Sequence, residues 1–161
     1  MTAKEKLMTA LRCIVRTLAG AALAAGFLAA GPLAANDIAQ IKTVNGTVVV
    51  ERGSQRILGA VGMKLQQADV IRTGIDGSVG ITFVDNTIMS AGPNSSLALD
   101  RFSFNSTTHE GKLDTSMRSG TLSVISGKIA KQSPEAMTVR TPASILGARG
   151  TEFFVQVVPL N

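Results

Sequence analysis

From residue 36 onward, apolar positions alternate with polar ones or gather in short runs rich in β-branched side chains. No stretch of about 11 or more residues carries the 3.6-residue apolar repeat of an amphipathic helix. The pattern therefore predicts a chain of short β-strands. We expect strands over residues 47–51, 68–73, 80–84, 87–90, 96–102, 112–118, 120–125, 137–140 and 153–158.

Short connections rich in Gly separate these expected strands. Asp85-Asn86 predicts a tight hairpin turn, because Asn tolerates the left-handed conformation that such turns require. Residues 103–111 are polar, and we expect them to form a long exposed hairpin tip. The segment 62–68 is compatible with a helix, but it is too short to decide the fold class.

The pattern as a whole predicts an all-β single domain. Two architectures fit it better than a flat sandwich: a short β-solenoid, or a rolled antiparallel sheet of many short strands. The region after residue 35 is long enough to bury one core without disulfides. We expect that core to be aliphatic, because the aromatic residues of the region are few: Phe83, Phe102, Phe104, Phe153 and Phe154.

The first 35 residues have the pattern of a bacterial export signal. Residues 1–16 are cationic, residues 17–30 are an uncharged Ala/Leu stretch, and Gly-Pro followed by small residues comes next. We expect a signal-peptide helix, cleavage near Ala35, and a periplasmic or secreted product. An uncleaved inner-membrane anchor is the alternative. After cleavage we expect no stable membrane span, because a spanning helix needs about 20 apolar residues.

The composition of the chain after residue 35 excludes several classes of functional site. The whole sequence has 16 basic and 11 acidic residues, but after residue 35 the counts are 12 and 10, which gives no case for nucleic-acid binding. The one cysteine, Cys13, lies in the leader, so disulfides, Cys-ligated zinc and a cysteine nucleophile are excluded after cleavage. One histidine, His109, excludes His-pair metal sites and disfavours a Ser-His-Asp triad. We therefore expect no enzyme activity, no metal and no cofactor.

The most specific motif is the stretch 139–153, which reads VRTPASILGARGTEF. It resembles the closing motif of the FecR domain family, V-x-T-P followed by G-x-R-G-T-x-F. Shorter elements resemble other family segments in the right order, and they lie at 46–48, 65–74, 77–87, 92–95 and 119–122. Ala68 and Asn86 depart from the family pattern, which often has Gly at these two turn positions.

The resemblance covers residues 44–157 and implies a domain organisation. We expect a signal peptide over 1–35, a short linker over 36–43, a FecR-like β domain over 44–158 and a C-terminal tail over 159–161. Regulators of this family also carry a sigma-factor-binding segment before a membrane helix and a signalling subdomain after the FecR domain. We expect neither segment in this chain, so the resemblance does not carry an anti-sigma function over to it.

Two groups of residues are candidate sites. The matched motif residues are expected to be structural, with Gly150 supplying a special backbone angle and Arg149 bonding to nearby carbonyls or a carboxylate. This group comprises Thr141, Pro142, Gly147, Arg149, Gly150, Thr151 and Phe153. The second group is a possible partner-binding loop at the polar tip, and it comprises Phe104, Asn105, His109 and Glu110. The edge formed by the first or last strand is a further candidate surface.

The resemblance implies an exported FecR-domain protein of the bacterial envelope that works as a non-enzymatic binding or signal-relay module. We expect its partner to be another envelope protein, recognised through exposed strand edges and loops. The alternative is a structural or adhesive envelope component that assembles with copies of itself. The sequence leaves the oligomeric state open.

Overall fold

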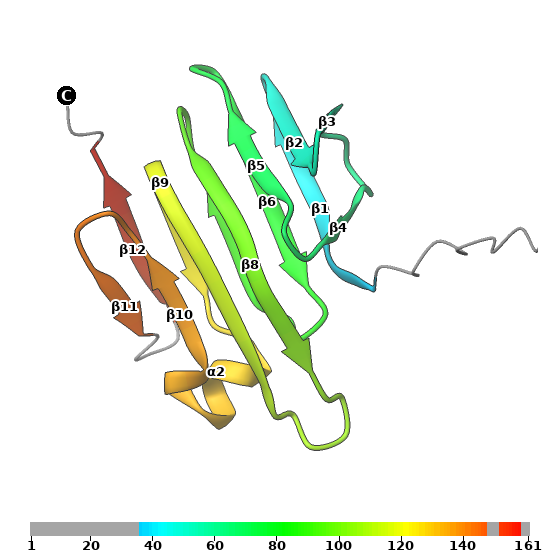
Figure 1. Cartoon of the computed structure of the whole chain (residues 1–161), viewed down its shortest axis with the longest axis vertical. Coiled ribbons are helices and arrows are strands. Elements are labelled where there is room, and N and C mark those ends of the chain that lie inside the picture. Colours follow the sequence, from blue (N-terminus) through cyan, green and yellow to red (C-terminus); the bar gives the residue numbers. More distant parts are fainter. Residues whose placement is uncertain (1–35, 148–151, 159–161) are drawn as a thin grey trace, which may run out of the picture. The chain divides into compact units, whose positions relative to one another are not determined.

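The computed structural model describes residues 36–147 and 152–158, all within one unit, Ala34–Asn161. The expected signal peptide and the tail lie outside the described residues, as do Arg149, Gly150 and Thr151. The described residues form twelve strands, one short helix and one 3-10 turn (Figure 1). They are β1 (Asp37–Asn45), β2 (Val48–Arg52), β3 (Gln55–Leu58), β4 (Lys64–Gln66), β5 (Val70–Thr73), β6 (Ser78–Phe83), β7 (Ile88–Ala91), β8 (Ser96–Phe104), β9 (Gly111–Ile125), α2 (Lys128–Gln132), η1 (Pro134–Ala136), β10 (Met137–Arg140), β11 (Ile145–Gly147) and β12 (Glu152–Val157).

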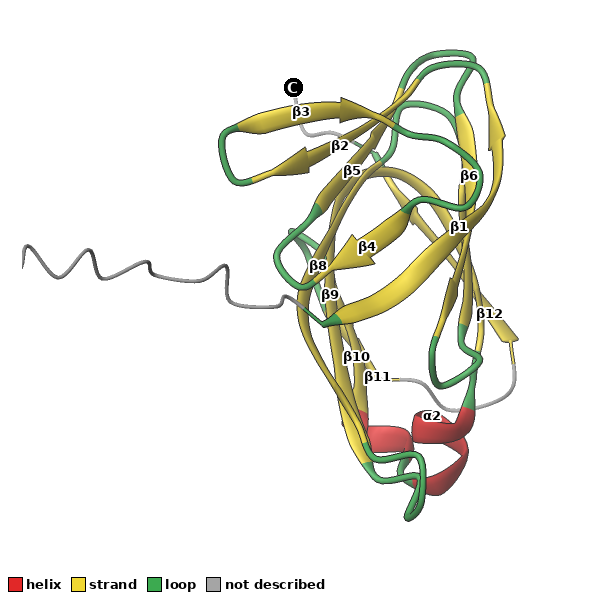
Figure 2. Cartoon of the chain, turned by 90° about the vertical axis from the view of Figure 1, so that its right-hand side faces the viewer, coloured by secondary structure: helices red, strands yellow, loops and turns green. Residues whose placement is uncertain are grey.

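The strands form one sheet in the order β3-β2-β5-β8-β9-β7-β6-β1-β4, with β10 and β12 also paired to β9, and β11 paired to β10. Neighbouring strands are antiparallel except β9 and β10, which are parallel. The sheet is curled into a half-barrel, so one part of it covers the other (Figures 1 and 2). The rolled sheet is thus confirmed over the solenoid, whose successive coils would be parallel.

Strand β9 belongs to both parts of the curled sheet. Its first half pairs with β8 and β10, and its second half pairs with β7 and β12. We call β2, β3, β5, β8, the first half of β9, β10 and β11 the front layer. We call β1, β4, β6, β7, the second half of β9 and β12 the back layer. In Figure 2 these layers lie at the left and the right, with α2 at their lower end.

The core lies between the two layers and is aliphatic, as expected. Alternate residues of each strand are buried against the opposite layer, for example Leu97 and Met117 from the front and Ile81 and Met89 from the back. Phe83 stacks on Phe102 across the core with ring centroids 5.6 Å apart. The alternation of apolar and polar residues in the sequence therefore corresponds to side chains that point into the core and side chains that point outward.

The expected strands are present, with three differences. Residues 112–118 and 120–125 form one strand, β9, because Gly120 adopts a φ of 92° and lets the strand bend without ending. The expected linker over 36–43 is wrong: β1 begins at Asp37 and pairs with both β4 and β6, since Ile38, Ala39 and Ile41 are buried. The helix considered over 62–68 is also wrong, because the strand β4 lies there.

No helix among the described residues is both long enough and apolar enough to cross a lipid bilayer.

Candidate functional site

The Asp-Asn-Thr segment of the family pattern joins the β6–β7 hairpin to the start of α2. Asp85 is fully buried, and its Oδ1 accepts a hydrogen bond from the Thr87 amide at 3.1 Å. Its Oδ2 accepts bonds from the Thr87 hydroxyl at 2.6 Å and the Ile129 amide at 3.4 Å. Asn86 has a φ of 68°, which confirms the turn predicted from Asp85-Asn86. We call this segment the Asp-Asn-Thr clamp. Its role is structural, because the Asp85 carboxylate is occupied by hydrogen bonds from neighbouring amides and from the Thr87 hydroxyl.

A second buried acid, Asp69, fixes the chain before β5. It accepts bonds from Arg52 Nε at 2.9 Å, from Arg52 Nη2 at 2.8 Å and from the Gln66 amide at 2.8 Å. This interaction raises the pKa of Arg52 above its ordinary value, mainly through the hydrogen bond to Asp69. Ala68 has a φ of 70°, which explains why the family often has Gly at this position.

Residues from three motif elements, 65–74, 92–95 and 119–122, contact one another at the end of β5. The Thr73 hydroxyl donates to the Gly92 carbonyl at 2.6 Å and accepts a bond from the Ser95 amide at 2.8 Å. The Ser95 hydroxyl in turn accepts a bond from the Thr121 amide at 3.1 Å. These elements are far apart in the sequence, and the fold brings them into one hydrogen-bonded junction.

The described part of the closing motif forms the end of β10, a turn, β11 and the start of β12. Thr141 starts the β10–β11 turn: its amide donates to the Ser144 carbonyl at 2.8 Å, and its hydroxyl accepts a bond from the Ser144 amide at 3.0 Å. Pro142 is exposed in this turn, Gly147 ends β11, and Phe153 packs against the core from β12. The roles expected for Arg149, Gly150 and Thr151 stay predictions.

The tip between β8 and β9 brings Phe104, Asn105, His109 and Glu110 together. Asn105 Oδ1 accepts bonds from the Thr107 and Thr108 amides at 2.9 and 3.2 Å. The rings of Phe104 and His109 stack with centroids 6.3 Å apart. The Asn105 amide donates to the Glu110 carbonyl at 2.8 Å. The tip is therefore held by its own side chains, which is the behaviour of a structural turn.

The edges of the sheet offer a different kind of surface. The first strand expected from the sequence, over 47–51, corresponds to β2, which pairs with both β3 and β5 and is not an edge. The last strand, β12, pairs only with β9 among the described residues. Exposed edges are commonly protected by Lys, Pro or a bulge. Arg56 lies in β3 and Lys64 lies in β4, but β12 reads EFFVQV, with Glu152 as its one charged residue.

A groove lies between β12 and the β10–β11 turn, and this groove is the feature that sequence reasoning missed. Its volume is about 370 Å³. The side chains around it are apolar or uncharged: Thr141, Pro142, Ala143, Ser144, Leu146, Phe154, Val155, Gln156, Val157 and Val158. Phe154 is 64% exposed and Val158 is 72% exposed. The groove and the β12 edge together make a site for an extended, largely uncharged chain segment.

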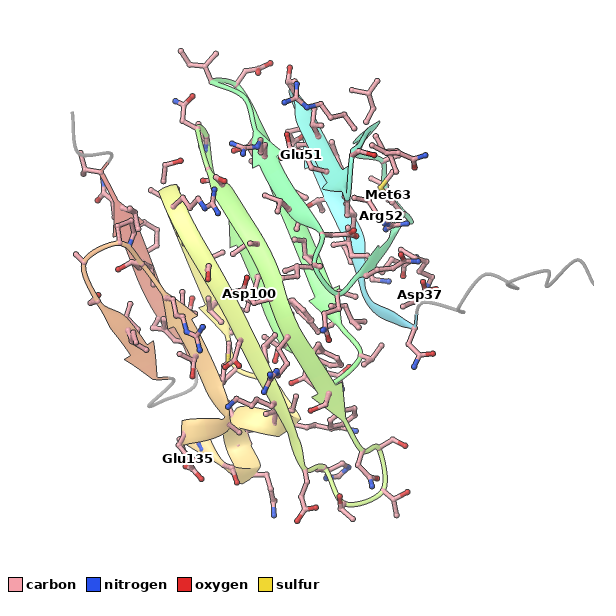
Figure 3. The ribbon with its side chains drawn as sticks, viewed as in Figure 1. Asp37, Glu51, Arg52, Met63, Asp100 and Glu135 are labelled. Atoms are coloured by element: carbon pink, nitrogen blue, oxygen red, sulfur yellow. The ribbon has the colours of Figure 1, made fainter. Side chains whose placement is uncertain are left out.

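Several charged residues of the front layer form surface ion pairs. Glu51, which lies in β2 next to Arg52 (Figure 3), contacts Arg72 Nε at 2.9 Å and Arg56 Nε at 3.1 Å. The hydrogen bond from Arg72 lowers the pKa of Glu51 below its ordinary value of 4.5. Across residues 36–147 and 152–158, no three His, Cys, Asp or Glu side chains are grouped as metal ligands would be.

Comparison with known proteins agrees with the motifs. No curated protein and no solved structure matches this chain. The family model described as FecR protein matches residues 69–159, which include the second buried acid, the Asp-Asn-Thr clamp and the closing motif. This match spans more than half of the chain and confirms the resemblance read from the sequence. The chain belongs to the FecR family.

Proposed function

We propose that this chain is an exported FecR-domain protein of the bacterial envelope, working as a non-enzymatic binding or signal-relay module for another envelope protein. Family membership supports the binding or relay role. The cationic and apolar leader supports export. The most polar motif residues, Asp69 and Asp85, support a structural role for the motifs, because backbone and side-chain donors already occupy their carboxylates.

Recognition occurs by strand addition at β12. An extended segment of the partner pairs its main chain with the edge of β12 that has no strand neighbour among the described residues, and its side chains enter the adjoining groove. Main-chain hydrogen bonds give this mode its affinity, and the groove selects the side chains. The single observation that carries the proposal is the unprotected β12 edge beside an uncharged groove.

The hairpin tip is the weaker of the two candidate surfaces. Asn105, His109 and Glu110 already bond or stack within the tip, so a partner would have to break these contacts or bind around them. The outer edge of β12, by contrast, has no strand partner among the described residues that would have to be displaced.

Site-specific photo-cross-linking in the cell envelope tests the proposal. A photoreactive residue at Gln156, in the groove, is expected to cross-link to one envelope protein, and the same residue at Thr107, in the tip, is not. Phe154→Lys is expected to remove the cross-link, because it places a charged gatekeeper on the edge. Ile75→Lys, at an 82% exposed site in the β5–β6 turn, is the matched control and is expected to leave the cross-link intact.

Cross-links from Thr107 alone would contradict strand addition and assign recognition to the tip. Export is tested separately by determining the N-terminal residue of the protein recovered from the envelope. We expect a terminus near residue 36, whereas a protein that keeps its leader would support the anchor alternative.

A further inference from the structure

The outer faces of the two layers differ in charge. On the front layer, the outward positions carry charged side chains across most strands, with Lys and Arg in excess of acids; Arg72, Arg140 and Glu51 are examples. On the back layer, the outward positions of β6, β7 and the second half of β9 carry Ser, Thr, Gly and Ile. Ser90 and Ser123 face each other at the centre of this uncharged surface.

A band of exposed apolar side chains crosses the back layer. Ile88 of β7 lies directly opposite Ile125 of β9, and they are 39% and 43% exposed. Phe154 of β12 lies opposite Ser123, one outward position along from Ile125. Val84 lies two residues after the outward Thr82 of β6, just beyond the end of the strand, and is 53% exposed. Neighbouring outward positions of this kind lie within about 8 Å of each other, so the four side chains form one patch.

The charged residues of the back layer lie at its two rims, with Lys on one side and Glu on the other. Lys42 and Lys64 lie on the β1–β4 side, with Asp37 beside them, and Glu152 lies on the β12 side. Lys42 Nζ donates to Gln40 Oε1 at 2.7 Å, which places its charge at the level of Gln40. Gln40 and Glu152 lie in one row across the sheet. Gln40 is opposite Thr82, Thr82 is opposite Ile88, and Ile88 is opposite Ile125, which is opposite Glu152. The two charges therefore stand at opposite ends of one row.

We propose that the outer face of the back layer is an interface between two copies of this chain. The strand order across the face is β1-β6-β7-β9-β12, with β7 in the middle. A twofold axis along β7 places β1 of one copy over β12 of the other. Lys42 of each copy then meets Glu152 of its partner, and the apolar bands cover each other. The same surface serves on both sides, as in an isologous dimer.

The size of the face limits the area that the dimer can bury. Five strands spaced about 4.8 Å apart, each roughly 20 Å long, cover roughly 500 Å². A pair of faces buries roughly 1,000 Å², which lies at the lower limit of specific interfaces. Because this area is small, we expect a reversible dimer instead of a permanent one. The front layer is the poorer candidate, because its excess of positive charge would be stacked against itself.

Sedimentation equilibrium of the purified protein tests this interface over roughly 5 to 500 µM, the range expected for a weak dimer. A concentration-dependent monomer–dimer equilibrium is expected. Ser123→Arg, at the centre of the face, is expected to weaken dimerisation at least about tenfold, because each copy buries an unpaired charge. Ser103→Arg, exposed on the front layer, is the matched control and is expected to leave the equilibrium unchanged.

A charge exchange tests the twofold arrangement itself. Lys42→Glu alone and Glu152→Lys alone are each expected to weaken the dimer, and the double variant is expected to restore it, because the pair joins two copies. A protein that stays monomeric over the whole range, or a dimer that Ser123→Arg leaves unchanged, would overturn the proposal. Thermal unfolding of every variant separates loss of the interface from loss of the fold. Phe154 belongs to both the groove and this face, so the dimer is tested at Ser123, which lies outside the groove.

Discussion

At the scale of single residues, the two buried acids of the family motifs stabilise the fold. Asp69 and Asp85 are completely buried, and each accepts several hydrogen bonds from amides or from a paired side chain. A buried carboxylate is stable only when its oxygens are satisfied in this way. These acids therefore determine where turns and strands begin.

Replacing Asp85 with Ala is expected to lower the free energy of unfolding by roughly 2 to 4 kcal/mol, because the buried Thr87 and Ile129 amides lose their acceptor. Chemical denaturation measures the change. Asp100→Ala is the control: Asp100 is exposed on the front layer (Figure 3) and bonds to the Ser116 hydroxyl. An equal loss in both variants would contradict the clamp role of Asp85.

The ion pairs of Glu51 make a pH-dependent contribution. Arg72 lowers the pKa of Glu51 in the folded protein below its ordinary value of 4.5, so the contribution is present above pH 4.5 and is lost as the pH falls through the lowered pKa. The difference in stability between the wild type and Glu51→Gln is expected to shrink over this window. Denaturation at a series of pH values measures it, and Glu135→Gln, at an exposed acid near α2, is the control. A difference that does not change with pH would contradict the assignment.

At the scale of elements, β9 is the strand on which the others depend. It pairs with β7, β8, β10 and β12, and it passes from one layer to the other at Gly120. A side chain at this position would meet the backbone and the hydroxyl of Ser95. Gly120 therefore allows the bend through both its positive φ and its lack of a Cβ atom.

Gly120→Ala is expected to lower stability by about 3 kcal/mol or more, since it adds a clash with Ser95 to the strain of a positive φ. Gly53→Ala is the matched control. Gly53 also has a positive φ, 58°, but no atom lies within 4 Å of an added Cβ. We expect Gly53→Ala to lower the free energy of unfolding by about 1 kcal/mol, because it adds only the strain of the positive φ. Equal losses would show that the contact with Ser95 is unimportant.

The elements found from the sequence are those with strong local signals. Residues 137–140 were predicted as a strand and form β10, because Met137 and Val139 alternate with polar neighbours. The missed strands β3, β4 and β11 have three or four residues each and depend on pairing with neighbours. The local signal of β1 is weaker, because its alternation is interrupted where the register shifts between Ile41 and Thr43.

At the scale of the whole molecule, the two layers share one core and one strand. Met117 in the first half of β9 and Leu122 in the second half belong to the same buried cluster. A loss of packing in one layer therefore weakens the other.

Met117→Ala and Leu122→Ala are each expected to lower stability by about 2 to 5 kcal/mol. Each variant is also expected to keep a single unfolding transition, because neither layer can retain its core alone. Calorimetry that compares the calorimetric and van't Hoff enthalpies measures this. Two resolved transitions in either variant would contradict the shared core.

The surfaces proposed for binding could be found only in part from the sequence. The last strand was named as a candidate edge, and β12 is one. The groove was not foreseen, because it depends on the β10–β11 turn lying beside β12. Alternation along 78–83 and 120–125 reveals an outward face for each strand, but only the strand order places these faces side by side.

The late position of β9 has a consequence for biosynthesis. The edges of β7 and β8 have no second neighbour until β9 emerges from the ribosome, after eight other strands have been made. Pairing between segments so distant along a polypeptide is slow. Until then both edges stay unpaired, and a chaperone that covers them would protect the nascent chain from aggregation.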